Sequence, residues 1–150
     1  MNRTGNERTG NQMLCIPAKG GVELSEATMA AIGEDGYAVP AAASAKLRVA
    51  GCVLRHCDNR NGEDGEQTAS VKRGTFVWGN DGTIKGTDIL KPCYVKDERT
   101  VTLAADGSCM AGTILEAADD GVTVDMAWAA AALAPAAAGD GEQEKGGDGV

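Results

Sequence analysis

Turn-forming residues divide this chain into short apolar runs at intervals of roughly ten residues. Glycine supplies 21 of the 150 residues, and combinations of glycine with Asp or Asn separate the runs, as in GNDG at 79–82 and ADDG at 118–121. Such clusters favour tight turns between strands. The spacing therefore predicts an all-β chain, built as a small antiparallel barrel or sandwich.

Changes in composition divide the chain into three parts. Residues 1–12 are polar without periodicity and predict a flexible N-terminal arm. Residues 13–128 carry the apolar runs and predict one β-rich domain. Residues 129–150 are rich in Ala, Gly and Glu and predict a flexible C-terminal tail with little to bury.

Several runs have the pattern of strands. Residues 46–56 alternate with apolar side chains on both sides, which predicts a strand covered on both faces. Residues 69–79 predict another strand, in which Gly74 indicates a bulge or bend. Residues 93–95 and 100–103 predict a hairpin, and residues 108–116 pair with 122–126. Two interpretations remain open for residues 23–32: a short helix capped by Ser25, or an extended segment lying along a neighbour.

The charge of the chain excludes several classes of partner. It has 14 Lys and Arg against 22 Asp and Glu, a formal net charge of −8, and is repelled by nucleic-acid phosphates. No apolar run reaches the roughly 18 residues that span a membrane. The polar start, MNRTGNERTGNQ, lacks the apolar stretch of a signal peptide, so we expect a protein made in a cytoplasm.

The stretch CVLRHC at 52–57 contains the only histidine and two of the five cysteines. Zinc ligands usually come in two close pairs, and no second pair is present. A nucleophilic pair would require His56 to meet one of the distant cysteines, which are Cys15, Cys93 and Cys109. The sequence favours a strand that ends where a polar loop begins, with no metal ligand and no catalytic role.

The loop that follows, DNRNGEDGE at 58–66, is rich in carboxylates that calcium could use. Counted from Asp58, the third and fifth positions are Arg60 and Gly62, so the pattern of an EF-hand fails. We expect a solvated hairpin loop. The motifs GxxxxGK[ST], GxSxG and HExxH are all missing from the sequence, which predicts no cofactor and no enzymatic activity.

Three stretches together resemble the small capsid cement, or decoration, proteins of tailed bacteriophages. They are KGGVELSEATMAAIGEDGYAVPA, then LRVAGCVLRHCDNRNGEDGEQTASVKRGTFVWGN, then DILKPCYVKDERTVTLAADGSCMAGTILEAADDGVTVDM, and they cover about residues 19–126. The polar arm and the long tail depart from the family pattern. The resemblance implies a structural protein of the virion with a β-rich barrel or a jelly-roll-like sandwich fold. It also implies binding on the outside of the shell of major capsid protein. It further implies self-association as a dimer or trimer and no enzymatic activity.

Candidate contact residues follow from exposed charge and large apolar side chains. The hypothesis places the partner interface at the terminal arms with Arg73, Trp78, Met13 and Trp128. Trp78 and Trp128 could instead complete the core. An alternative function is a small ligand- or receptor-binding β-domain on a virion surface, which predicts a concave pocket lined by aromatic side chains. An enzyme using Cys57 and His56 is a third possibility.

Overall fold

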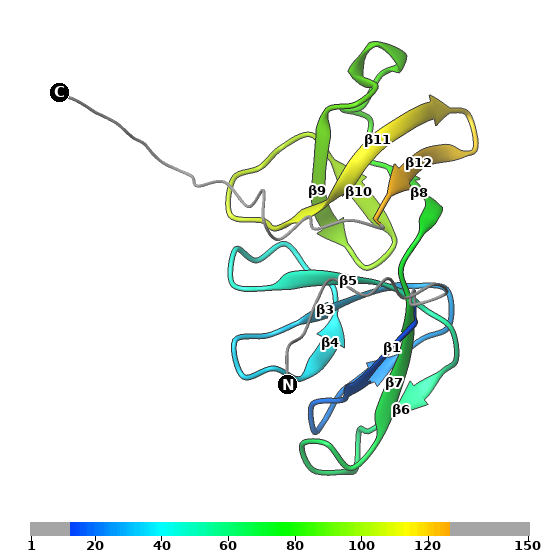
Figure 1. Cartoon of the computed structure of the whole chain (residues 1–150). Helices are drawn as coiled ribbons and strands as arrows, with labels where there is room; N and C mark the ends of the chain where they lie inside the picture. Colours follow the sequence, from blue (N-terminus) through cyan, green and yellow to red (C-terminus); the bar gives the residue numbers. More distant parts are fainter. Residues whose placement is uncertain (1–12, 127–150) are drawn as a thin grey trace, which may run out of the picture.

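The computed structural model describes residues 13–126, and within them the chain is almost entirely β-structure (Figure 1). This confirms the predicted fold class. The strands are β1 (Met13–Pro17), β2 (Glu23–Leu24), β3 (Met29–Ile32), β4 (Ala38–Pro40), β5 (Arg48–Val53), β6 (Cys57–Asp58), β7 (Thr68–Lys72), β8 (Thr75–Asn80), β9 (Pro92–Asp97), β10 (Thr100–Thr102), β11 (Met110–Ala118) and β12 (Gly121–Asp125). A 3₁₀ turn, η1 (Gly86–Asp88), lies between β8 and β9.

The strands form two units that follow one another along the chain (Figure 1). The first unit is a five-stranded sheet in the order β1-β7-β5-β3-β4, accompanied by the small β2–β6 pair. Its outer strands approach each other at a parallel bridge between Ala18 and Ala38, so the sheet curls almost into a barrel. The second unit is a closed five-stranded barrel in the order β10-β8-β12-β11-β9.

The predicted strand at residues 69–79 is divided between the two units. Strand β7 ends at Lys72 in the first unit, and β8 begins at Thr75 in the second. Gly74 lies between them with φ +157°, a conformation that is easy for glycine and unfavourable for other residues. The bend expected at Gly74 is therefore confirmed, and it is the point where the chain passes from one unit to the other.

Two apolar clusters fill the units, and strand β5 contributes to both. Ala50 and Val53 belong to the cluster inside the first unit, whereas Cys52 and Val49 face the larger cluster that continues into the second. The prediction that this strand is covered on both faces is confirmed. The helix considered for residues 23–32 is wrong, because β2 and β3 occupy this stretch and β3 pairs with β4 and β5 on its two sides.

The two units have the same topology. Counted along the chain, the five sheet strands are β1, β3, β4, β5 and β7 in the first unit and β8 to β12 in the second. In each unit the first of these strands pairs with the fifth, the fifth with the fourth, the fourth with the second and the second with the third. In each, the third strand runs parallel to the first, through Ala38 with Ala18 and through Val101 with Asn80. The parallel contact closes a ring of otherwise antiparallel strands, so the second unit repeats the first in order and in direction.

The pairing registers align the repeat residue by residue. Gly51 lies opposite Ala30, and Gly112 lies opposite Cys93. A β-carbon on Gly51 would come within 2.3 Å of the Lys72 carbonyl oxygen, and one on Gly112 within 2.4 Å of the Asp125 carbonyl oxygen. The corresponding core positions, first unit then second, are Ile16 and Trp78, Ala30 and Cys93, Ile32 and Val95, Ala38 and Val101, Val53 and Ile114, Ala69 and Val122, and Val71 and Val124.

Candidate functional site

The residues of CVLRHC do not come together as a reactive site. Cys52 and Cys57 are buried in different apolar clusters. His56 lies at the surface, where its Nε2 is 2.5 Å from Glu23 Oε2. Across residues 13–126, no group of three or more His, Cys, Asp and Glu side chains is arranged to hold a metal ion. The stretch is the end of β5, which stops at Val53, followed by the short strand β6, which the sequence did not predict.

Burial raises the pKa of the cysteine thiols that the fold encloses. It raises the pKa of Cys93 to about 12, and it also raises the pKa values of Cys52, Cys57 and Cys109. The thiolate is the nucleophilic form, so these thiols are in an environment that suppresses reactivity.

We expect one rapidly reacting thiol in the native protein. Cys15 is exposed on β1, whereas the other four cysteines are buried. A disulfide reagent such as DTNB should therefore titrate one thiol quickly, and the remaining four only after unfolding. The variant Cys15→Ser should lose the rapid phase. A rapid phase that persists in this variant would show that a buried cysteine is activated.

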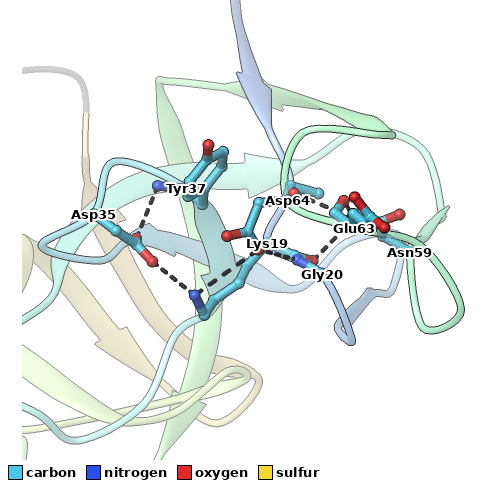
Figure 2. A network of polar contacts seen from close by, with 8 residues as sticks. Lys19, Gly20, Asp35, Tyr37, Asn59, Glu63 and Asp64 are labelled. Atoms are coloured by element: carbon cyan, nitrogen blue, oxygen red, sulfur yellow. Dashed lines mark hydrogen bonds and ion pairs between the residues drawn. The ribbon is translucent and has the colours of Figure 1, made fainter.

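The loop at residues 58–66 is held by a buried asparagine. The Asn59 side-chain amide donates to the carbonyl oxygens of Ala18 (3.2 Å), Lys19 (3.1 Å) and Glu63 (2.9 Å), and thereby joins the loop to the segment after β1 (Figure 2). The Asn59 backbone N–H also bonds to the Val22 carbonyl. The loop was expected to be solvated, which holds for most of its side chains but not for Asn59.

Lys19 connects this loop to the β3–β4 turn. Its Nζ donates to Asp35 Oδ2 at 2.7 Å and lies 3.9 Å from Asp64 Oδ1, and the Gly20 N–H bonds to the same Asp64 oxygen (Figure 2). A groove of about 460 Å³ opens beside Lys19 and Asp35. Its walls are mainly Gly, charged and aliphatic residues, and none of the lining residues is aromatic: Lys19, Gly33, Glu34, Asp35, Val39, Ser44, Lys46 and Leu47.

The corner before β9 is organised by Asp88. Its carboxylate accepts a hydrogen bond from Lys91 Nζ at 2.9 Å and another from the Lys85 N–H at 2.8 Å. These two bonds hold the pKa of Asp88 below its usual value, and the bond from the Lys91 side chain has the larger effect. The ionised carboxylate is thus favoured by the folded state.

Acid should weaken the fold partly through this carboxylate. A group whose pKa is lowered on folding contributes stability above its unfolded pKa of about 3.9, and that contribution is lost as the pH falls through the folded value. Between about pH 6 and about pH 2.5 the urea midpoint should fall, and it should fall less in Asp88→Asn. Equal acid sensitivity in the variant and the parent would exclude a contribution from Asp88.

The four predicted contact residues fall in different environments. Met13 is exposed at the start of the edge strand β1, and Arg73 is half-buried between the units, with its Nη2 3.5 Å from the Met126 carbonyl oxygen. Trp78 is buried in the second unit, and its Nε1–H is 3.2 Å from Met126 Sδ. Trp78 completes the core instead of presenting a surface anchor. Trp128 and both terminal arms lie outside the described residues.

A group of exposed apolar residues on the second unit was not anticipated from the sequence. Its members are Val77, Ile89, Leu90 and Leu115, each at least one-third exposed. Leu90 also has a positive φ of +71°, which is unusual for a bulky side chain. We call these four residues the apolar outer face. Val77 and Leu115 lie on strands, where an exposed apolar residue looks like a core residue until the register is known, whereas Ile89 and Leu90 lie on the turn between η1 and β9.

Comparisons with known proteins identify no relative: no family model, no curated protein and no solved structure matches this chain. Within residues 13–126, no helix is long and apolar enough to cross a membrane.

Proposed function

We propose that this protein is a bacteriophage capsid cement protein, which binds the outer surface of the assembled shell of major capsid protein and stabilises it against the pressure of packaged DNA. The observation that carries the proposal is the order and spacing of the motifs from about residue 19 to residue 126. Those motifs span nearly all of both units, so the resemblance concerns the whole described fold.

Two features of the chain support a structural role on the outside of a capsid. A formal charge of −8 suits a surface that does not face packaged DNA. The apolar outer face offers surface that a partner could cover. Binding to the assembled shell in preference to free subunits would stabilise the shell by mass action, and many repeated contacts would have to break together for the shell to rupture.

Co-sedimentation with mature particles that lack the protein tests the proposal. The purified chain should bind saturably and should restore resistance to heat and to low salt. A chain without residues 1–12 shows whether the N-terminal arm contributes to binding. Particles that bind no protein at micromolar concentration, or that gain no resistance when saturated, would contradict the proposed function.

The alternative function, a ligand- or receptor-binding domain, has one feature in its favour, the groove beside Lys19 and Asp35. The alternative predicts aromatic lining, and the groove has none, so it lacks the rings on which a sugar would stack. Binding on a glycan array that disappears in Asp35→Ala would favour this alternative over the cement role.

A further inference from the structure

The buried side chain of Asn59 has hydrogen bonds at its nitrogen but not at its oxygen. The side chain is 2% exposed, and its Nδ2 donates to the three carbonyl oxygens described above. These bonds fix the orientation of the amide, because turning it over would set its oxygen against the same carbonyls. The oxygen, Oδ1, is buried and has no hydrogen-bond partner within residues 13–126. A buried acceptor without a partner is costly and indicates a bound water molecule or ion.

A carboxylate oxygen of Glu66 lies beside Asn59 Oδ1. A β-carbon placed on Gly62 would be 2.1 Å from Asn59 Oδ1 and 3.0 Å from Glu66 Oε1, so both oxygens lie on the same side of Gly62. Glu66 Oε1 is held there by the Glu63 N–H, at 2.9 Å. Two acceptor oxygens that converge in this way repel each other unless a donor or a cation lies between them.

The two residues line a cavity of about 170 Å³, which we call the oxygen cavity. All of its lining residues except the glycine carry a side-chain oxygen: Asp58, Asn59, Asn61, Gly62, Glu66 and Gln67. Calcium takes about six to eight such oxygens, from carboxylates, amides, main-chain carbonyls and water. Since two of the lining side chains are carboxylates, amide oxygens and water would have to supply the remaining ligands, which calcium accepts.

The charge around the oxygen cavity is negative after the nearby basic groups are counted. Residues 58–67 contain one basic side chain, Arg60, which donates to both carboxylate oxygens of Asp58, at 2.9 and 2.8 Å. Against it stand four carboxylates, those of Asp58, Glu63, Asp64 and Glu66. Just outside the loop, Lys19 and His56 contact carboxylates of their own, those of Asp35 and Glu23. The loop thus keeps an excess of negative charge, which favours a cation over a neutral water molecule.

We propose that the oxygen cavity binds a calcium ion, held directly by Asn59 Oδ1 and the Glu66 carboxylate. The ion gives the buried oxygen its partner and offsets the charge of the loop. Because Arg60 already neutralises Asp58, binding should be weak, with a dissociation constant of about 10⁻⁴–10⁻³ M. The same Asn59 side chain holds the segment after β1, so calcium should also strengthen the junction between that segment and the loop.

A calcium titration of the full-length protein, first freed of metal with EDTA, tests the proposal. In nuclear magnetic resonance spectra, calcium should shift the side-chain amide signals of Asn59 saturably. The thermal midpoint should rise by at least about 3 °C in about 10 mM calcium chloride, compared with EDTA and potassium chloride at the same ionic strength.

Two glutamine variants locate the ion. Glu66→Gln removes the carboxylate beside Asn59 Oδ1 and should weaken calcium binding at least about tenfold. Glutamine keeps an oxygen that can accept the Glu63 N–H, so the loop should fold as in the parent. Glu63→Gln is the matched control, because it removes the same charge from the same loop at a residue outside the cavity lining, and it should keep the affinity within about threefold.

Each contrary result has a definite meaning. If calcium changes neither the Asn59 signals nor the thermal midpoint, water alone pairs with Oδ1 and the proposal is wrong. If both glutamine variants lose affinity equally, calcium is attracted by the charge of the loop as a whole, and the oxygen cavity is not its site. None of these measurements involves capsids, so their results are independent of the proposed function.

Discussion

Gly112→Ala should lower the free energy of unfolding by about 3 kcal/mol, since the added methyl group meets main chain and a fully buried valine side chain, neither of which can move aside freely. Its β-carbon would lie 2.4 Å from the Asp125 carbonyl oxygen and 2.7 Å from Val124 Cγ1. To relieve this close contact, β12 would have to separate from β11 within a closed barrel. Urea denaturation followed by circular dichroism measures the loss.

The repeat predicts that Gly51→Ala behaves similarly. There the β-carbon would lie 2.3 Å from the Lys72 carbonyl oxygen, and φ is +151°, so strain adds to the close contact. Gly86→Ala is the matched control, because nothing lies within 4 Å of its β-carbon. A loss below about 1 kcal/mol at Gly112 would show that the barrel can widen there, and would contradict the close packing of these strands.

Asn59→Ala should have the second large effect, a loss of about 2 kcal/mol. It removes a buried amide that donates to three carbonyl oxygens and leaves that of Lys19 without its donor, whereas the carbonyls of Ala18 and Glu63 keep the N–H groups of Gly65 and Glu66. Two of these carbonyls, of Ala18 and Lys19, lie in the segment after β1, so the loop and that segment should loosen together. Hydrogen exchange at the backbone amides of Gly21 and Gly65 reports this, since both are bonded across the same junction.

The variant Asn59→Asp tests whether the Asn59 amide stabilises the loop as a hydrogen-bond donor or only by filling space. It keeps the shape of the side chain but sets a carboxylate against carbonyl oxygens, so the loss should be at least as large as for alanine and should grow as the pH rises. Asn61→Ala, an exposed residue of the same loop, serves as the control. Alanine and aspartate variants as stable as the parent would mean that water replaces the amide.

The sequence was most informative where turns and alternation coincide. Gly74 was expected to bend the chain, and the hairpin of β9 and β10 was expected from its apolar runs; the structure has both. The sequence was misleading at residues 23–32, where the local propensity for a helix competes with strand pairing. Ala30 of β3 is buried between β4 and β5, and that tertiary contact outweighs a weak local preference.

The repeat leaves a trace in the sequence that a search for self-similarity would find. VAGCVL at 49–54 corresponds to MAGTIL at 110–115, around the two glycines that allow close strand approach. Elsewhere the equivalent residues have diverged, as Ile16 and Trp78 have, so only the registers make the match complete. The role of Asn59 could not be predicted, because it depends on a contact between segments about forty residues apart.

Two units of the same topology in one chain create a risk of strand exchange during folding, because a strand from one unit could enter the other in the correct direction. The sizes of the core residues oppose this. The first unit uses Ala30, Ala38 and Ala69 where the second uses Cys93, Val101 and Val122. Strand β12 in place of β7 would overfill the first core, and β7 in place of β12 would leave a cavity in the second. The divergence of the two cores thus makes each strand specific for its own unit.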